Sequence, residues 1–412
     1  MQNKTVRKII VGLSAVGPGL FLIGYNIGTG SVTTMAKAGA EYGMTLFWAL
    51  VLSCVFTFIL MVAYGRITLV TGKTVLFNIK TNFRAGKIVA IYILAALIIG
   101  ELLALMGVMG IVADLLQEGT RLIFGGEGFS TFWITFILVI GLYLLLWHGK
   151  YLAFEKILTF FVILMGLCFV VVFFMVKPSI SAIFSGLVPS VPDTPGAFGL
   201  VAAMAGTTCS AAVFVMRSTV VAEKGWTIKN LKGESKDAFV SAAMMLFLSA
   251  VIMAVSAGTL NVMGLRLDKT VDMVHLFEPI GGKIAAFILI LGIAGAGLST
   301  IFPIILIAPW LICDYTGRAR NIHSPMFRIL GFIGILFCFG MQFLEQRPPA
   351  VMIFSQAFQA CILPAAVIPI LLLINRKQIM DKHTADAKMN IGLTAVLLFS
   401  LLTTYFAIIE LF

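Results

Sequence analysis

Eleven long apolar stretches dominate this 412-residue chain and constrain what it can fold into. Each approaches or exceeds the roughly 20 residues that an α-helix needs to cross a bilayer. With 60% hydrophobic residues and 11% charged residues, the chain is far from soluble globular proteins, whose charged fraction is about 25%. The sequence predicts a multi-pass membrane protein with spans over residues 11–35, 42–65, 88–116, 131–148, 152–176, 197–221, 238–264, 283–312, 326–343, 350–374 and 390–411.

The basic residues predict how these spans are oriented. Most of the 29 lysines and arginines fall at the N-terminus or in the connections that share its side of the membrane. Because cytoplasmic loops are rich in Lys and Arg, we expect a bacterial-type inner or plasma membrane protein with a cytoplasmic N-terminus and an external C-terminus. The net charge of +11 then faces anionic lipid headgroups, so the bilayer is the expected partner and nucleic acid is not. We expect a monomer.

Two of the predicted spans contain a stretch that weakens a helix. The first carries "NIGTGS", Asn26 to Ser31, and the sixth carries "GTTCS", Gly206 to Ser210. These breaks are five spans apart, so two repeats of five spans would enter the membrane in opposite directions, the plan of many secondary transporters. We expect repeats over 1–180 and 181–376 and an additional helix within 377–412. The alternative is that small residues only allow close helix packing.

Three motifs resemble the NRAMP family of metal transporters. "GPGLFLIGYNIGTGSVTTMAKAGAEYG" is similar to the family's first span, "GAGLSTIF" to its eighth and "IFSQAFQACILPAAVIPILLLINRKQIM" to its tenth. The resemblance implies an all-α, LeuT-like fold with a 5+5 inverted repeat and an eleventh transmembrane helix. It also implies a secondary transporter whose substrate is a metal cation.

The same resemblance shows which family residues this chain lacks. The family's Asp-Pro-Gly-Asn falls on Gly28 to Ser31, so glycine replaces the metal-binding aspartate. The methionine ligand of the sixth span falls on Ser210, and the two acids of the proton pathway fall on Leu94 and Leu97. Of the side chains that resemble family ligands, Gln356 remains. The usual ligands for a dehydrated divalent ion are therefore absent from those positions.

The remaining groups at the two breaks are carbonyls, hydroxyls and one amide. They can bind a monovalent ion, a largely hydrated ion, or a polar neutral or zwitterionic solute, and the half-helix N-termini favour an anionic group. No resident cofactor is expected, and the sequence assigns no set of metal ligands. The candidate substrate-binding residues are Tyr25, Gly28, Thr29, Ser31, Thr207, Ser210 and Gln356.

Two ionisable residues inside the spans are candidates for coupling or gating, because charged groups at membrane depth are costly. Glu101 lies in the middle of the third span, either as a substitute cation or proton site or as a buried partner of a backbone or basic group. Arg217 follows Ser210 by about two helical turns. It is either a gating residue or an arginine that snorkels to the membrane interface.

Three functions are compatible with these residues. The first is an NRAMP-related transporter of a metal cation, and the second is a transporter of an organic solute, such as an amino acid or amine, on the same scaffold. The third is a membrane protein that transports nothing. An enzyme is not expected, because no nucleophile and base pair is recognisable. The volume of the central cavity separates the first two: an ion-sized cavity favours the cation, and roughly 100 Å³ or more favours the organic solute.

Overall fold

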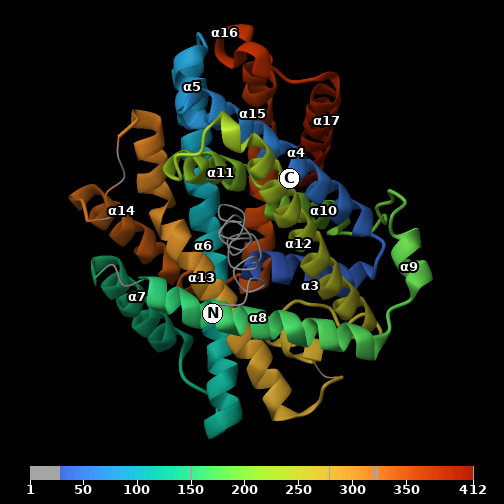
Figure 1. The fold of residues 1–412 in the computed structure, drawn as a ribbon. Coiled ribbons are helices and arrows are strands. Elements are labelled where there is room, and N and C mark those ends of the chain that lie inside the picture. Colours follow the sequence, from blue (N-terminus) through green and yellow to red (C-terminus); the bar gives the residue numbers. More distant parts are fainter. Residues whose placement is uncertain (1–27, 149–150, 278, 319–320, 322, 412) are drawn as a thin grey trace, which may run out of the picture.

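The computed structural model describes residues 28–148, 151–277, 279–318, 321 and 323–411, and the regular elements in this part of the chain are helices (Figure 1). The α-helices are α3 (Thr29–Tyr42), α4 (Phe47–Thr71), α5 (Val75–Asn82), α6 (Gly86–Phe124), α7 (Thr131–His148), α8 (Tyr151–Val176), α9 (Ile180–Ser185), α10 (Ala197–Thr208), α11 (Ala211–Glu223), α12 (Leu231–Gly258), α13 (Gly282–Thr316), α14 (Pro325–Leu336), α15 (Pro348–Ile374), α16 (Lys377–Met380) and α17 (Ala387–Leu411). The 3₁₀ helices are η1 (Ile228–Asn230), η2 (Thr270–Phe277), η3 (Phe337–Gln342) and η4 (Asp381–His383).

The predicted spans correspond to these helices. Within the described residues, eight helical segments are long and apolar enough to cross a membrane, and two shorter apolar helices cover Thr131–Trp147 and Val162–Val176. Of the first predicted span, 11–35, the structure describes residues 28–35, and α3 begins there at Thr29. The prediction of an all-α, multi-pass membrane protein is confirmed. The eight segments are Phe47–Thr71, Gly86–Phe124, Ala197–Ala222, Ile228–Gly258, Gly282–Thr316, Pro325–Gln342, Pro348–Ile374 and Ala387–Glu410.

Several helices begin and end at residues suited to those positions. Helices α4 and α13 end at Gly72 and Gly317, which adopt the left-handed conformation with φ of 64° and 72°. Only glycine takes this conformation without strain, and it lets the cap N–H bond back to the last turn. Helix α14 begins after Ser324, whose hydroxyl accepts a hydrogen bond from the N–H of Phe327.

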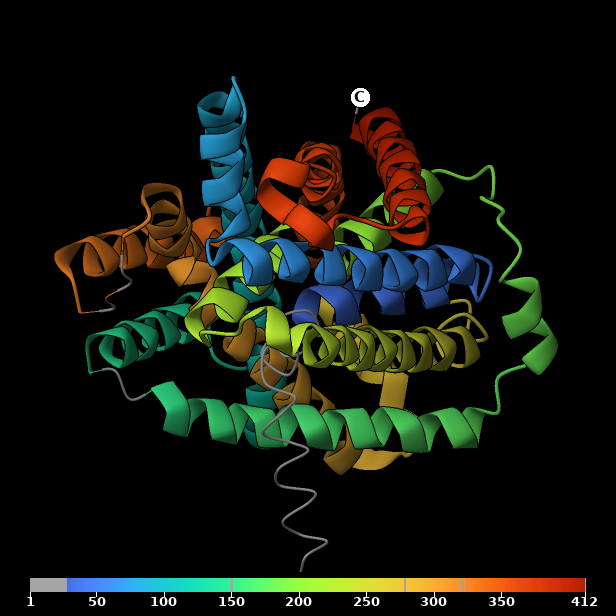
Figure 2. The ribbon, with the colours of Figure 1, turned by 45° about the horizontal axis from the view of Figure 1, so that its top comes forward.

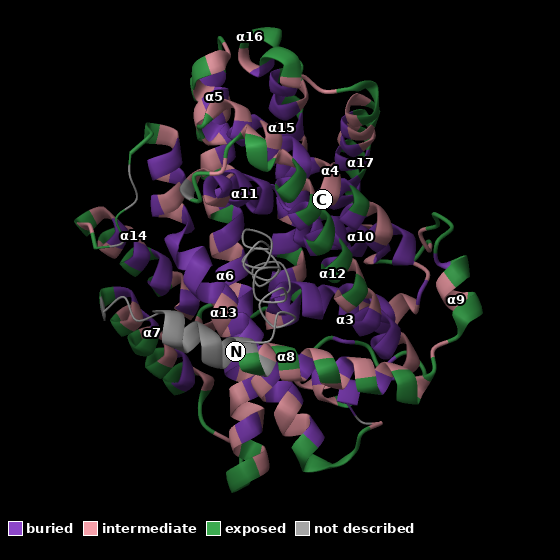
Figure 3. Ribbon diagram, in the orientation of Figure 1, coloured by how far each residue is buried: buried purple, intermediate pink, exposed green. Residues whose placement is uncertain are grey.

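The helices pack as a bundle in which one interrupted segment is central. Figure 2 shows α4, α12 and α8 running roughly parallel to one another, and α12 contacts both α4 and α8. Helices α6, α13 and α15 pass through the middle, where α6 contacts the other two. In the apolar stretch of the α10 and α11 segment 94% of the residues are buried, whereas in that of Pro325–Gln342 at the periphery 28% are buried (Figure 3). The interrupted segment therefore lies in the core.

The outer helices expose apolar side chains. Trp133 and Ile137 of α7 are 60% and 67% exposed, and Ile163 and Leu167 of α8 are 58% and 59% exposed. In water, such surfaces would be costly, but hydrocarbon tails cover them without penalty. The exposed faces of α7 and α8 are accordingly the faces that contact lipid.

The break in the sixth predicted span is present. Helix α10 ends at Thr208, Cys209 leaves the helical conformation with φ of −107° and ψ of 46°, and α11 begins at Ala211. Ser210 is extended and caps α11, because its Oγ accepts a hydrogen bond from the N–H of Ala212. The chain changes from one helix to the next within Cys209 and Ser210.

The first predicted break differs in part from the expectation. Thr29, Gly30 and Ser31 are not unwound, because they form the first turn of α3, and the carbonyl of extended Gly28 accepts from the N–H of Val32. Asn26 and Ile27 lie outside the described residues. The prediction that "GTGS" as a whole is unwound is therefore wrong for Thr29 to Ser31. Helix formation here satisfies the backbone at membrane depth, where an unpaired N–H or C=O is costly.

Candidate functional site

A small cavity lies where α3 and α11 begin. Its volume is about 40 Å³, and helices α3, α6, α10, α13 and α15 contribute to its wall, together with the break before α11. Because a water molecule occupies roughly 30 Å³ in the liquid, this space holds a single ion or a very few waters. The lining residues are Gly28, Gly30, Ser31, Glu101, Ala104, Val108, Thr207, Ser210, Thr300, Ile304, Met352, Gln356 and Gln359.

Most of the predicted site residues meet around this cavity. Gly28, Ser31, Thr207, Ser210 and Gln356 all line it, although they come from four different segments of the chain. The Ser31 hydroxyl donates to the carbonyl of Gly28 at 3.1 Å. The beginning of α3, the interrupted segment of α10 and α11, and α15 therefore place hydroxyl and amide groups around one small space.

Among the described residues, Thr29 is a predicted substrate-binding residue that does not line this cavity. The Thr29 hydroxyl donates to the carbonyl of Ile293 in α13 at 3.2 Å, and Thr29 is not among the lining residues. One residue advances a helix by about 100°, so Thr29 and Ser31 cannot share a face of α3. Tyr25 lies outside the described residues.

Glu101 joins the same cavity from α6. It lies one turn from Ala104 and two turns from Val108 on the face of α6 that lines the space, and the residue is 3% exposed. Among the residues that line the cavity, Glu101 carries the one carboxylate. The acid that the sequence singles out in the third span therefore lies at the cavity wall.

Three lining residues whose side chains carry oxygen, nitrogen or sulfur were not predicted from the sequence. Gln359 accepts a hydrogen bond from the Ser210 hydroxyl at 2.6 Å, and its spacing of three from Gln356 could have revealed that both amides lie on one face of α15. Thr300 belongs to the "GAGLSTIF" motif, but its direction depends on how α13 is rotated. Met352 gave no sequence signal, because a methionine in an apolar helix is usually a core residue.

Arg217 lies elsewhere, in a buried ion network between α11 and α12. It is fully buried, and its Nη2 donates to Glu234 Oε1 at 3.0 Å and to the Glu234 carbonyl at 3.1 Å. Its Nη1 donates to Asp237. The alternative of a snorkelling arginine is wrong, because both acids neutralise the guanidinium inside the protein. Glu234 also packs against Gly65 of α4, where no side chain would fit.

Polar contacts connect three helices at the end of the molecule where α5 lies. The Thr219 hydroxyl of α11 donates to Asp314 of α13 at 2.5 Å, and both residues are buried. Nearby, Lys80 Nζ of α5 donates to the carbonyl of Tyr315 at 2.9 Å and lies 4.2 Å from the centroid of its ring. These contacts join α11 and α5 to α13 at this end.

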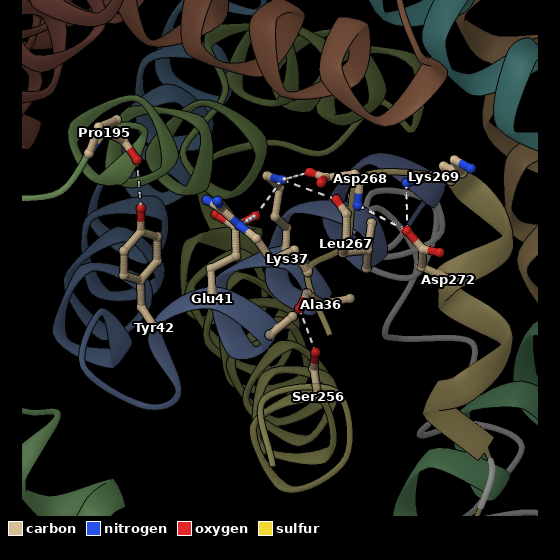
Figure 4. A network of polar contacts seen from close by, with 12 residues as sticks. Ala36, Lys37, Glu41, Tyr42, Pro195, Ser256, Leu267, Asp268, Lys269 and Asp272 are labelled. Carbon is tan, nitrogen blue, oxygen red and sulfur yellow. Dashed lines mark hydrogen bonds and ion pairs between the residues drawn. The ribbon is translucent and has the colours of Figure 1, made fainter. Parts of the chain in front are cut away.

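A second polar network surrounds the C-terminal half of α3, away from the small cavity (Figure 4). Lys37 Nζ donates to Glu41 at 2.6 Å, to the carbonyl of Leu267 at 3.0 Å and to Asp268 at 3.4 Å. The Tyr42 hydroxyl donates to the carbonyl of Pro195 at 3.1 Å. Helix α3 is thereby joined to the connection after α12 and to the approach to α10.

A larger cavity, of about 430 Å³, lies at this end of the molecule. Charged side chains of both signs line it, and apolar residues of α15 form part of its wall. In the described part of the chain, no group of three or more His, Cys, Asp or Glu side chains is arranged to hold a metal ion. The charged residues that line this larger cavity are Lys37, Glu41, Asp268, Glu345, Arg347 and Glu410.

Comparison with known sequences shows a match between this chain and one protein family. The family described as "Natural resistance-associated macrophage protein-like" (Nramp) matches residues 19–410. The divalent metal cation transporter MntH of Pectobacterium carotovorum is 24% identical over 389 residues, which cover 92% of this chain and 89% of that protein. MntH of Yersinia pestis is 23% identical over 420 residues, which cover 97% of this chain and 98% of the relative.

Solved structures are similar over nearly the whole chain. A crystal structure of the Eremococcus coleocola manganese transporter superposes with a TM-score of 0.69 at 15% identity, covering 97% of this chain and 86% of the other. Mhp1, a nucleobase-cation-symport-1 family transporter, superposes with a TM-score of 0.60 at 15% identity, covering 95% and 92%. These similarities confirm the predicted LeuT-like fold.

Proposed function

The chain belongs to the natural resistance-associated macrophage protein-like (NRAMP) family, and from this we propose that it is a secondary transporter whose substrate is a divalent metal cation. Relatives named as divalent metal cation transporters match it over nearly their whole length. The cation would pass through the small cavity between the beginnings of α3 and α11. No covalent chemistry is proposed.

The volume of the cavity is the observation that favours a metal cation over an organic solute as the substrate. A space of about 40 Å³ holds an ion with little of its hydration shell, whereas a bound amino acid or amine needs roughly 100 Å³ or more. The oxygen-rich wall is chemically suited to a cation, because carbonyl, hydroxyl and amide oxygens can replace water around it. The organic-solute alternative is therefore not favoured.

Glu101 supplies the negative charge that a cation site in a membrane requires. A dehydrated divalent ion is costly at low dielectric unless anionic ligands compensate for the lost water. The positive ends of α3 and α11 face the cavity and oppose the cation. We therefore assign Glu101 to cation binding and expect modest affinity. Ser31, Thr207, Ser210 and Gln356 are assigned as neutral oxygen donors.

Arg217 is assigned a positioning role. It is remote from the cavity wall, but its ion pairs hold α11 against α12. Ser210, which lines the cavity, caps the first turn of the same helix. By fixing α11, Arg217 fixes the place of the Ser210 hydroxyl.

The decisive experiment measures uptake by the purified protein in liposomes. The compounds tested are Mn²⁺, Mg²⁺, Ca²⁺ and a panel of amino acids and amines. We expect saturable uptake of Mn²⁺ and no uptake of the organic compounds. Glu101→Gln should abolish cation uptake, because it removes the charge from the cavity. Glu118→Gln is the matched control on the same helix, since Glu118 pairs with Arg121 at 3.2 Å away from the cavity. Uptake of an amino acid, or full cation uptake by Glu101→Gln, would refute the proposal.

We further propose the arrangement of the chain in a bacterial-type inner or plasma membrane. The distribution of basic residues supports a cytoplasmic N-terminus and an external C-terminus. The expected monomeric state stays a prediction. The repeat boundaries, 1–180, 181–376 and 377–412, stay predictions.

A further inference from the structure

Residue 28 has no room for a side chain. A Cβ built on Gly28 would collide with Oγ1 of Thr300 in α13 and would lie 3.2 Å from the Cβ and Cγ2 of that threonine. Thr300 does not turn away freely, because its hydroxyl donates to the carbonyl of Ala296 at 2.8 Å. The position that corresponds to the aspartate of related transporters is thus filled by a neighbouring helix.

The carboxylate at the cavity comes instead from α6. Glu101 lines the cavity, and its backbone belongs to a 39-residue helix that passes through the centre of the molecule. Gly107, on the same helix, lies so close to Met352 of α15 that a Cβ would be 3.0 Å from the Met352 backbone. The close approach of α6 and α15 brings the side chains of both helices to one space.

A thioether enters the same cavity from α15. A Cβ on Gly30 would collide with Cε of Met352 and would lie 2.7 Å from Nε2 of Gln356. The bare backbone of Gly30 therefore leaves room for the end of the methionine and for the amide. Met352 is 2% exposed and lines the cavity on the helix face that it shares with Gln356.

We propose that this protein has a relocated ligand set, with the carboxylate of Glu101 and the thioether of Met352 coordinating the cation together with the amide oxygen of Gln356. This inference rests on the proposed transport of a divalent cation and narrows its class. A thioether is a soft ligand that adds affinity for transition metals and cadmium and adds little for Mg²⁺ or Ca²⁺. The substrate is accordingly a borderline-soft divalent metal ion, and Met352 determines specificity.

The test measures cation binding to the purified full-length chain by calorimetry with the chlorides of Mn²⁺, Cd²⁺, Mg²⁺ and Ca²⁺. The variants are Met352→Leu, Glu101→Gln and the control Met109→Leu, a buried methionine of α6 that does not line the cavity. Met352→Leu should weaken Cd²⁺ binding by roughly tenfold or more and change Mg²⁺ binding little. Glu101→Gln should remove binding of all four ions, and Met109→Leu should leave it unchanged.

A second measurement needs no variant and holds even if Met352→Leu fails to fold. X-ray absorption at the cadmium edge of the wild-type complex should show one sulfur neighbour among oxygen neighbours. Oxygen neighbours alone, with divalent binding intact, would refute the thioether assignment and leave the proposed transport standing. If the wild-type chain neither binds nor transports any of the four ions, the proposed function itself fails.

Discussion

At the scale of single residues, the cavity depends on two glycines whose missing side chains admit groups from other helices. Thr300 occupies the space beside Gly28, and Met352 and Gln356 occupy the space beside Gly30. A glycine in a membrane helix commonly allows close packing of backbones. Here the packing has a chemical result, because it decides which side chains reach the cavity.

Replacing Gly28 tests this packing. Gly28→Ala should destabilise the protein by about 1–3 kcal/mol, the usual cost of inserting a methyl group into a filled space. The measurement is thermal unfolding of the purified protein in detergent. Gly28→Ala combined with Thr300→Ala should recover part of the loss, because Oγ1 and Cγ2 are removed. Gly233→Ala is the control, since no heavy atom lies within 4 Å of a Cβ there. Equal stability of Gly28→Ala and the wild type would contradict the packing argument.

At the scale of elements, α11 is held by charges that are buried within the protein. Arg217 is fully buried against Glu234 and Asp237 of α12. Such a pair contributes little net stability when intact, because both ions lost their water. Removing one partner is different, since it leaves an uncompensated charge inside the protein.

Arg217→Met should therefore cost about 3–5 kcal/mol of stability, measured by thermal unfolding in detergent. The triple variant Arg217→Met, Glu234→Gln and Asp237→Asn should recover much of this loss, because no buried charge remains. Arg121→Met is the comparison: Arg121 pairs with Glu118 at 3.2 Å but is 57% exposed, so its loss should cost at most about 1 kcal/mol. A small effect of Arg217→Met, like that of Arg121→Met, would show that the network is not structural.

The elements themselves were largely predictable, because hydropathy and helix-weakening residues are local signals. In the described part of the chain, eight apolar helices of membrane length, two shorter ones and the break at Cys209 and Ser210 follow from the sequence. The predicted break in the first span extended too far along the chain, since the hydroxyl-rich turn from Thr29 to Ser31 is helical despite its composition. The partners of Arg217 lie 17 and 20 residues away on another helix, beyond the reach of a pattern read along one helix.

Within the site, the sequence identified polar residues better than it identified their directions. Ser31 and Glu101 line the cavity, whereas the Thr29 hydroxyl donates to the carbonyl of Ile293 in α13. The direction depends on the rotation of each helix, which is set by packing against the others. Met352 and Thr300 were not predicted, because neither residue type is unusual in an apolar helix and the sequence does not show which way each side chain points.

At the scale of the whole molecule, contacts join the helices at both ends of the cavity. Thr219 and Asp314 join α11 to α13 at the end that carries α5, and Lys37 joins α3 to Asp268 at the other end. A transporter that exposes its site alternately to the two sides must break one set of contacts at a time. The hydrogen bond between Thr219 and Asp314 should therefore oppose opening at its own end.

Thr219→Val should favour opening at the α5 end, because it removes the hydroxyl that bonds to Asp314. The reporter is Ser31→Cys in a chain whose six native cysteines are replaced. A membrane-impermeant thiol reagent applied from the α5 side should modify this cysteine faster in the Thr219→Val background. Thr316→Val is the control, since the Thr316 hydroxyl donates within its own helix to Ile312 at 2.7 Å. An unchanged rate of modification would exclude a gating role for Thr219.

The orientation of the chain can be tested with reporter fusions. Alkaline phosphatase fused after Phe412 should be active, and green fluorescent protein at the same place should be dark, because we expect this end outside the cytoplasm. Fusions after Lys382, in the basic connection between α15 and α17, should give the reverse result. Fluorescence from the C-terminal fusion would invert the proposed topology.

The contact between Gly28 and Thr300 also limits how this protein can evolve. An aspartate at residue 28 cannot be accommodated while Thr300 stays in place, so a single substitution in that direction passes through a poorly packed intermediate. The order of changes then matters: residue 300 must become smaller before residue 28 can accept a side chain. A mutational library covering both positions should show strong epistasis, with an acid at 28 tolerated only beside a small residue at 300. Without a change at residue 300, the filled space therefore disfavours any side chain at residue 28.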